Sequence, residues 1–572
     1  MDDAGNTASM TAAGALLMRL KALGVDYIFA NSGTDFPPII EGAAQALHDG
    51  VSLPEMIVAP HEHAALGMAH GVYLASGQPQ AVMLHTNVGL ANGAIGAINA
   101  ATDHVPMLLM SGRTPTTEQG RFGARTVPIG WGQEMRDQTA LVREASKWDY
   151  ELRFPEQTAE LLDRALAIAG STPKGPVYLS LPREALCEPC GTIDRTAPQQ
   201  MTAAQSFAGK ADIRQAAKLL ADAKRPLIII QHGTGSEEAF QALSQLAEAW
   251  SVPVCQYWAI ALGVPYNHNC YIGMNPGPWL ADADVVLAID TLAPWSPDIH
   301  APPTDCKVIY LGPDPLQSRF PVRNFQADLS IACETADGIL ALAKALPKQT
   351  AKRKAAISKR QSKVHEAADA HRAEIAKASA ATPQGRMTKA FVSHVLGQAT
   401  KNHRATILSE LGAPLEPLGL QAFDAWRQEP CSGGLGWSFP CGMGMKLADP
   451  ERLVVATMGD GSYIFSNPVA CHQIAETYGI GIVVVILNNA EWGAVRMSVA
   501  GLYPDGYAAK SNQMPLTTLS PSPDFAAVAK ASRAFAETVT EPSKLAGAVD
   551  RAIKVAQEEN RLALLDVRVM PE

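Results

Sequence analysis

The chain has 572 residues and a formal net charge of −9 at pH 7. This length is too great for one hydrophobic core, so we predict three or four domains. The negative charge argues against a nucleic-acid-binding protein, and the uninterrupted apolar runs are too short to cross a membrane. The chain starts Met1-Asp2-Asp3, without the pattern of a signal peptide, and its nine cysteines are mostly scattered. We therefore expect a cytoplasmic protein with reduced thiols.

The first block of the chain, from about residue 10 to residue 186, has the pattern of an α/β domain. A helix is predicted over residues 11–23. Short apolar strands, with helical patterns between them, are predicted over residues 27–30, 55–59, 80–84, 107–110 and 177–181.

Two candidate active-site residues follow strands of this block, where α/β proteins bind ligands. Most helical glutamates are solvated, but Glu62 opens a helix that is too apolar to be exposed. A partly buried carboxyl is costly to ionise without a partner, which is typical of a proton-transfer group. His85 lies in a turn of glycines and small polar residues after another strand. A structural histidine is the alternative there, but the neighbouring strand end with Glu62 favours an active-site rim.

A second α/β block runs from about residue 211 to residue 346. Its turn His232-Gly233-Thr234-Gly235 follows a strand but lacks the full dinucleotide-binding fingerprint, so we favour an ordinary turn. Residues 348–380 are rich in Lys, Arg, Ala and Glu, which predicts a solvated linker helix. Strands of the block are predicted over residues 226–230, 285–289 and 308–311.

The third block contains the strongest motif. Gly459-Asp460-Gly461-Ser462 follows a strand predicted over residues 454–458, and Asn488-Asn489 follows the next predicted strand, residues 482–487. The glycines let a phosphate approach the backbone, and carboxylate and amide oxygens suit Mg²⁺ or Ca²⁺. We interpret the motif as a site for a metal-bound diphosphate. Two ordinary turns are the alternative, and the spacing of one βαβ unit argues against it.

A glycine-rich loop precedes this motif. It places Gly433, Gly434 and Gly436 around Leu435, and a helix of small residues is predicted after it, over residues 440–447. Glycines that flank one leucine suit a backbone pressed against a ring system. A plain glycine-rich loop is the alternative.

Together these motifs resemble those of the thiamine diphosphate (ThDP)-dependent 2-oxo-acid decarboxylases and acetohydroxyacid synthases, over nearly the whole chain. Within that family they are most similar to those of benzoylformate decarboxylases. The similar segments are Leu84-His85-Thr86, Gly433 to Gly436, and Asn488 to Arg496. A second active-site histidine of those enzymes falls on His268.

The resemblance implies an α/β fold of three doubly wound parallel-sheet domains. These are a pyrimidine-binding domain in residues 1–190, a central domain in 200–347, a linker in 348–385 and a diphosphate-binding domain in 386–572. In the family the cofactor lies between domains of two subunits, so the resemblance also implies a homodimer or a homotetramer built as a dimer of dimers.

Roles carry over from the family to matching residues. Glu62 resembles the glutamate that protonates the aminopyrimidine ring, and His85 and His268 resemble the proton-transfer histidines. Leu435 resembles the wedge that holds the cofactor bent, beside the Gly433 carbonyl that accepts a hydrogen bond from its amino group. The implied metal ligands are Asp460, Asn489 and the carbonyl of Glu491. The implied diphosphate contacts are Gly412, Ala413, Gly459, Gly461 and Ser462.

Three departures from the family pattern concern the substrate. Thr34 replaces a small hydroxyl residue that holds the substrate carboxylate. Ser498 replaces a phenylalanine of the aryl pocket, which opens or polarises that pocket. The segment from Gly120 to Arg136 is longer than in the decarboxylases and carries three arginines. It reshapes the entrance or binds an anionic part of the substrate, and a surface or interface loop is the alternative.

The resemblance leaves three functions open. The first is decarboxylation of a 2-oxo acid with ThDP and Mg²⁺, and the second is carboligation or acyloin cleavage of the acetolactate-synthase type. The third is a ThDP-binding scaffold without turnover, against which the costly acid Glu62 argues. The synthase branch also admits FAD as a further cofactor, but no sequence feature requires it.

Overall fold

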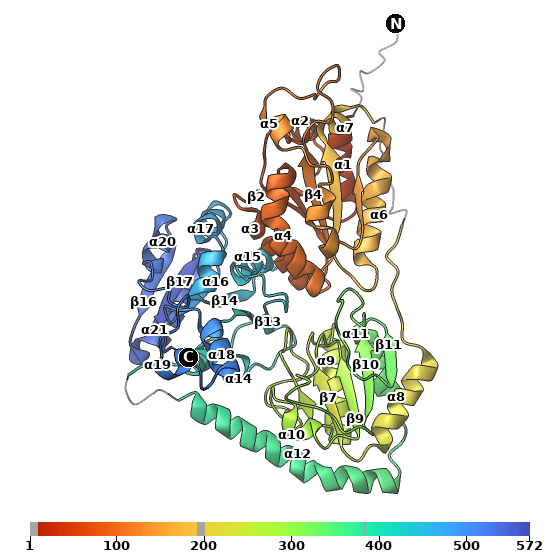
Figure 1. Cartoon of the computed structure of the whole chain (residues 1–572), viewed down its shortest axis with the longest axis vertical. Coiled ribbons are helices and arrows are strands. Elements are labelled where there is room, and N and C mark those ends of the chain that lie inside the picture. The colour runs from red at the N-terminus through yellow and green to blue at the C-terminus, as the bar shows by residue number, and fades with distance from the viewer. Residues whose placement is uncertain (1–9, 191–200, 381–384, 572) are drawn as a thin grey trace. The chain divides into compact units, whose positions relative to one another are not determined.

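The structure is a computed structural model that describes residues 10–190, 201–380 and 385–571 (Figure 1). The chain packs as two compact units. The first comprises residues 1–204, 430–451 and 464–480, and the second comprises residues 205–429, 452–463 and 481–572.

The first unit is built on a six-stranded sheet in the order β2-β1-β3-β4-β6-β5, with every neighbouring pair parallel. Helices α1, α2 and α6 cover one face through a core of leucine, isoleucine and alanine, and α3 and α4 lie against the strands as well. The strands are β1 (Tyr27–Ala30), β2 (Glu55–Val58), β3 (Gln80–Leu84), β4 (Met107–Arg113), β5 (Asp149–Glu151) and β6 (Val177–Pro182).

The helices of this unit alternate with its strands until α7, and two come from later in the chain. They are α1 (Ala12–Ala22), α2 (Pro37–His48), α3 (Glu62–Ser76), α4 (Thr86–Thr102), α5 (Ile129–Gly132), α6 (Thr158–Gly170), α7 (Arg183–Cys187), α15 (Ser438–Ala448) and α17 (Pro468–Thr477). Short 3-10 helices cover Thr139–Leu141, Arg143–Ala145 and Pro155–Gln157.

Helices α3 and α15 touch backbone to backbone. A Cβ atom at Gly71 would lie 1.9 Å from the carbonyl oxygen of Cys441, and one at Gly444 would lie 2.0 Å from that of Met68. Only glycine fits at these positions, because a neighbouring backbone cannot move aside as a flexible side chain can. The contact fixes the glycine-rich loop, which precedes α15, to the helix that begins with Glu62.

The second unit contains two further parallel sheets, in the orders β11-β10-β9-β7-β8 and β13-β12-β14-β15-β17-β16. Strand β15 is buried along its whole length, as its continuous apolar run predicts for a central parallel strand. The strands of the first sheet are β7 (Pro226–Ile230), β8 (Val254–Cys255), β9 (Val285–Ile289), β10 (Lys307–Gly312) and β11 (Leu329–Ala332). Those of the second are β12 (Ala405–Glu410), β13 (Trp426–Gln428), β14 (Leu453–Gly459), β15 (Val483–Asn488), β16 (Phe535–Val539) and β17 (Ala563–Arg568).

Helices α8, α9 and α11 pack on the first of these sheets, and α13 and α21 pack on the second. The helices of the unit are α8 (Lys210–Asp222), α9 (Glu237–Trp250), α10 (Gly277–Leu280), α11 (Thr335–Ala345), α12 (Ala351–Ala378), α13 (Lys389–Thr400), α14 (Leu415–Leu418), α16 (Asp460–Phe465, whose last two residues belong to the first unit), α18 (Gly493–Leu502), α19 (Tyr507–Ser511), α20 (Phe525–Ala531) and α21 (Pro542–Glu558).

The linker helix α12 is more than a solvated connection. Its Arg360 donates hydrogen bonds to the carbonyl oxygens of Trp250, Ser251 and Ala223 at 2.5–3.1 Å. Val364 of the same helix is fully buried. One side of α12 therefore packs on the central sheet region, and the rest is exposed as the composition predicts.

The fold class is confirmed: three parallel-sheet α/β domains are present. Their exact limits stay a prediction. The break at residues 191–199, the end of the linker at residues 381–384 and the residues Met1 to Asp3 lie outside the described part of the chain. Within the part that is described, no helix is long and apolar enough to cross a membrane.

Substituting either contact glycine should loosen the first unit. We expect Gly71→Ala and Gly444→Ala each to cost about 1–3 kcal/mol, because overpacking forces the two backbones apart. Differential scanning calorimetry measures this as a lower melting temperature. Gly501→Ala is the matched control, since a Cβ atom there meets nothing within 4 Å and α18 is a helix. Unchanged melting of both contact variants would contradict the packing.

Candidate active site

Glu62 is held between two asparagine side chains of the first unit. It begins α3 and is 9% exposed. Asn31, which follows β1, donates from Nδ2 to Oε1 at 2.8 Å, and Asn92 of α4 donates to Oε2 at 2.5 Å. Both partners are neutral amides, which fix the orientation of the carboxylate without adding a charge. Gly89 of α4 leaves room for it, because a Cβ atom there would approach Oε1 to 3.2 Å.

His85 is held from both ring nitrogens. It follows β3, and its Nδ1 lies 2.5 Å from Oδ1 of the buried Asp35. Its Nε2 lies 3.0 Å from Nε2 of Gln133. The hydrogen bond with Asp35 raises the pKa of His85 above its usual value and outweighs burial, which lowers it. A Cβ atom at Gly33 would lie 2.1 Å from Nδ1, so the ring packs directly on the backbone that leads to Asp35.

The glycine-rich loop belongs to the same compact unit as Glu62 and His85. Asn99 of α4 donates from Nδ2 to the carbonyl of Gly434 at 2.8 Å, and a Cβ atom at Gly434 would collide with this side chain. Gly433 adopts φ +67°, the left-handed region that favours glycine. Leu435 is half-buried.

Helix α4 links the acid to this loop. Asn92 and Asn99 are seven residues apart, so they lie on the same helix face about 10 Å from each other. One binds the carboxylate of Glu62 and the other binds the loop carbonyl of Gly434. The spacing between these two groups is therefore set by one rigid helix.

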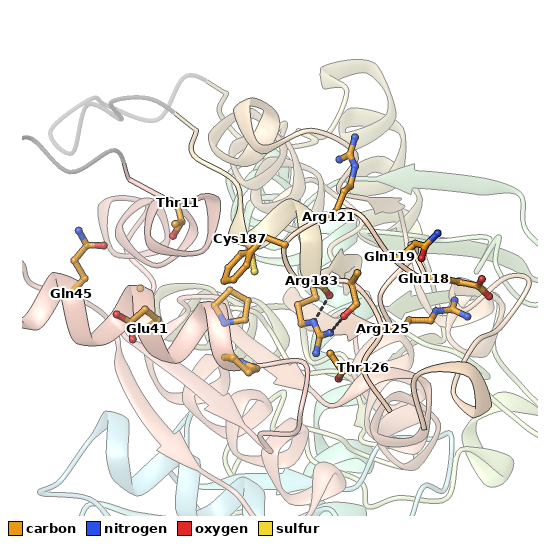
Figure 2. A pocket seen from close by; sticks show the side chains of 16 residues that line it. Thr11, Glu41, Gln45, Glu118, Gln119, Arg121, Arg125, Thr126, Arg183 and Cys187 are labelled. Carbon is orange, nitrogen blue, oxygen red and sulfur yellow. Dashed lines mark hydrogen bonds between the residues drawn. The ribbon is translucent and has the colours of Figure 1, made fainter. Parts of the chain in front are cut away.

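Figure 2 shows Arg183 beside the first part of the segment from Gly120 to Arg136, with its hydrogen bonds to that segment as dashed lines. A pocket of about 870 Å³ lies between this segment, α2 and Arg183. Arg183 donates to the carbonyl oxygens of Gly123 and Ala124 at 2.7 and 2.6 Å.

Two of the three arginines in this segment already have carboxylate partners. Arg121 pairs with Glu188 at 2.8 Å, and Arg125 pairs closely with Glu134. This pairing weakens the interpretation of the segment as an anion-binding loop. Its clearest contact with the site is Gln133 on His85.

In the second unit the two halves of the diphosphate motif lie side by side. Strands β14 and β15 pair in parallel, with Gly459 opposite Leu487, so Asp460 and Asn489 follow at the same edge of the sheet. Asn488 is structural, because its Nδ2 donates to Asp566 and its Oδ1 accepts from the N–H of Ala490. Asn489 lines a small cavity of about 50 Å³, and its Oδ1 accepts from the N–H of Glu491 at 3.3 Å.

Asp460 has the features of a metal ligand. It is 2% exposed, and its Oδ2 has no hydrogen-bond partner among the described residues. Burial raises the pKa of this carboxyl, although backbone N–H groups of Asp460, Gly461 and Ala490 oppose the shift. A buried carboxylate oxygen without a partner is costly, and a divalent cation would satisfy it.

The remaining cavity lining suits a diphosphate. Ser462 is buried at the first turn of α16, where backbone N–H groups attract anions. A Cβ atom at Gly461 would lie 2.2 Å from the Trp492 ring, so glycine is required there. The side chain of Glu491 pairs with Arg496 at 2.8 Å, which leaves the backbone carbonyl as its contribution to a metal site.

Two further segments border this cavity or pack beside it. The Gly412-Ala413 turn lies on β14, because the N–H of Ala413 donates to Thr457 Oγ1 at 3.0 Å. Lys389 lines the cavity and donates to the carbonyl of Leu411 at 3.2 Å. The donor set of one orphaned carboxylate oxygen, one amide, one ammonium and a helix N-terminus fits a magnesium diphosphate.

Contacts in the central region do not support the proton-transfer role predicted for His268. Its Nε2 donates to the carbonyl of Ser244 at 3.0 Å, and its Nδ1 accepts from the N–H of Cys270 at 3.1 Å. Burial lowers its pKa. Since both ring nitrogens are engaged by backbone of the same region, His268 has the environment of a structural histidine. Sequence spacing could not reveal these contacts.

The two predicted substrate residues are on the surface of their own units. Thr34 is exposed in the turn between Gly33 and Asp35, and Ser498 is exposed on α18. Sequence reasoning missed Asp35, Gln133 and Lys389, as well as the three asparagines that hold Glu62 and the loop. Asp35 had a signal, because a carboxylate next to a strand-end turn is a natural partner for a strand-end histidine.

Comparisons with known proteins agree with this geometry. Three family models match in order: "Thiamine pyrophosphate enzyme, N-terminal TPP binding domain" at residues 10–141, the "central domain" at 213–342 and the "C-terminal TPP binding domain" at 419–567. Among curated proteins, the chain is 26% identical to a probable 2-ketoarginine decarboxylase of Pseudomonas aeruginosa, over 98% of this chain and 94% of that protein. It is 23% identical to the acetolactate synthase large subunit of Haemophilus influenzae, over 97% of this chain and 93% of that subunit.

Benzoylformate decarboxylase of Pseudomonas aeruginosa is 24% identical, over 83% of this chain and 85% of that enzyme. The fold is shared with the solved 4-hydroxybenzoylformate decarboxylase of Rhodococcus jostii RHA1, at a TM-score of 0.77 and 20% identity over 98% of this chain and 99% of that one. The three domain matches and the relatives lead to one conclusion: the chain belongs to the thiamine pyrophosphate enzymes, as a ThDP-dependent decarboxylase or carboligase.

Proposed function

We propose that the protein decarboxylates a 2-oxo acid to an aldehyde and CO₂, with ThDP and Mg²⁺. The observation that carries this proposal is the pair of Glu62 and His85 in one compact unit. Each turnover consumes one proton, because R–CO–COO⁻ and H⁺ give R–CHO and CO₂. A decarboxylase therefore needs a residue that delivers a proton, and a histidine held on a carboxylate suits that task.

The second unit would hold the cofactor through its diphosphate. Asp460, Asn489 and the Glu491 carbonyl would bind Mg²⁺, and Gly412, Ala413 and Ser462 would contact phosphate oxygens. Lys389 adds a positive charge at the same cavity. When bound, ThDP supplies the ring that accepts the electron pair left by CO₂.

The first unit would orient and activate the other end of the cofactor. Glu62 would share a proton with the aminopyrimidine, while Asn31 and Asn92 hold the carboxylate in place. The Gly433 carbonyl would accept a hydrogen bond from the amino group, and Leu435 would support the bent form. Thr34 would bind the substrate carboxylate, and Ser498 would leave the side-chain pocket open.

The acetolactate-synthase-type carboligase is the second candidate. It is supported by the likeness to acetolactate synthase over nearly the whole chain and by Ser498, which leaves room for an acceptor. The two functions differ in what happens after CO₂ leaves: a proton gives an aldehyde, and a second carbonyl compound gives an acyloin.

A panel of 2-oxo acids tests the function directly. It should include aryl, aliphatic and guanidino-bearing acids, the last because a relative is named as a 2-ketoarginine decarboxylase. We expect CO₂ release from at least one acid, dependent on added ThDP and lost on chelation of Mg²⁺. Aldehyde as the main product supports the decarboxylase, and acyloin as the main product supports the carboligase. No CO₂ from any acid would rule out both.

Glu62→Gln tests the assignment of the acid. We expect it to lower kcat by roughly a hundredfold or more, because the amide cannot exchange the proton. Steady-state kinetics of CO₂ release measure the loss. Glu160→Gln, on the exposed side of α6, is the matched control and should keep full activity. A Glu62→Gln variant with unimpaired kcat would refute the assignment.

We also propose a homodimer or a dimer of dimers that pairs through α4. This helix exposes a row of apolar side chains on one face: Val88 at 52%, Ile95 at 40% and Ile98 at 46%. A helix face of this kind is costly in water and is typical of an interface. A second copy fits best, because the same helix holds Glu62 and the cofactor loop.

Sedimentation equilibrium tests the assembly. Wild-type protein should sediment as a dimer or tetramer, and Ile98→Glu should shift it toward monomer because a charge enters the apolar face. Val322→Glu is the control, since Val322 is 87% exposed in the central region. A monomeric wild type would overturn the proposal.

A further inference from the structure

His85, which follows strand β3, has the buried carboxylate of Asp35 against its Nδ1 atom. Asp35 is 4% exposed, and its Oδ1 lies 2.5 Å from Nδ1 of His85. Its other oxygen accepts from the backbone N–H of Thr86 at 3.2 Å. Both carboxylate oxygens therefore engage His85 or the residue that follows it.

The surrounding backbone leaves this carboxylate little freedom. A Cβ atom at Gly112 of β4 would lie 1.6 Å from Oδ2, so only glycine fits against Asp35. Thr86 adopts φ +40°, an uncommon conformation for a β-branched residue. This conformation turns the N–H of Thr86 toward Asp35, and it is maintained by the packing at the end of β3.

The Nε2 atom of His85 faces the side-chain amide of Gln133, which can act as a hydrogen-bond donor or acceptor. Gln133 is 8% exposed and lies 3.0 Å from Nε2 of His85. A glutamine amide can donate, or can accept after turning through half a rotation. It can thus satisfy Nε2 whether or not that nitrogen carries a proton.

The charged groups that face His85 are both acidic. They are Asp35, in direct contact, and Glu62, which acts through space. Each favours the protonated imidazole over the neutral one. Gln133, from the segment that lies against Nε2, is neutral and opposes neither carboxylate.

We propose that Asp35 is a positioning residue that acts through His85: it holds a proton on Nδ1 and keeps Nε2 as the atom that delivers the proton consumed in each turnover. This inference rests on the proposed function. His85 changes from imidazolium to neutral imidazole as its Nε2 proton becomes the aldehyde hydrogen, and solvent restores that proton. Asp35 stays a carboxylate throughout. The segment from Gly120 to Arg136 supplies Gln133 as the second holder of the ring.

Chemical modification measures the effect of Asp35 without any turnover. Diethyl pyrocarbonate reacts with neutral imidazole, and mass spectrometry of the peptide that contains His85 gives its rate at each pH. In the cofactor-free wild type we expect a midpoint above the ordinary imidazole value of about 6.5. In Asp35→Asn the midpoint should fall, and the rate at neutral pH should rise about threefold or more. Equal midpoints in the two proteins would overturn the inference.

Asp137→Asn is the matched control. Asp137 is in the same unit but lies on the surface, where it pairs with Arg143. This variant should change neither the modification of His85 nor the pH profile of the reaction. If Asp35→Asn fails to fold, the pH midpoint of His85 modification in the wild type is the test by itself. A midpoint at or below the ordinary imidazole value contradicts the proposal.

Steady-state kinetics are the second test of the proposal. Asp35→Asn should lower kcat by about tenfold or more at neutral pH and move the alkaline limb of kcat/KM to lower pH, because the proton donor is lost earlier. In a His85→Gln background it should add little further loss, since Asp35 acts only through His85. If Asp35→Asn lowers kcat equally in the wild-type and His85→Gln backgrounds, the role of Asp35 is merely structural. If the wild type releases no CO₂, the proposed function fails, and the modification rates still decide the role of Asp35.

Discussion

The burial of one carboxylate, that of Glu62, is the constraint on which the first unit depends. Removing an ionisable group from water is costly unless hydrogen bonds compensate it. Here two asparagines supply them, from the end of β1 and from the middle of α4. Both partners are neutral amides, so neither adds a charge beside the acid. Neutral donors orient the group and leave its chemistry available.

The second unit has the opposite problem, a buried carboxylate oxygen that is left without a partner. At Asp460 the protein supplies backbone N–H groups but no side-chain donor to Oδ2 among the described residues. The two units thus treat their buried site carboxylates in different ways. Both carboxylate oxygens of Glu62 are hydrogen-bonded by the protein itself, whereas Oδ2 of Asp460 has no such partner among the described residues and suits a metal ion.

Sequence patterns predicted the parts of this site that depend on local rules. The strands before Glu62, His85, Asp460 and Asn489 were all expected, because parallel strands present their carboxyl ends at one edge. Asp35, Gln133 and Lys389 were not expected, since each reaches its site from a different loop or helix and no periodicity links them. The contacts of His268 were not expected for the same reason: its partners Ser244 and Cys270 are visible only once the central sheet has folded.

Helix α4 presents two kinds of surface within seventeen residues. One face is buried on the sheet. The other carries the asparagines that hold the acid and the loop together with the exposed apolar side chains, because Asn92 and Asn99 each follow one of them, Val88 and Ile95, by four residues, about one helical turn. A helix face that would serve both the proposed cofactor site and a second copy would couple the two by linkage: whatever either one contributes to ordering the helix lowers the cost for the other. Dilution, which separates the copies, would then lower the apparent affinity for the cofactor. Saturation with cofactor would in turn strengthen the association of the copies.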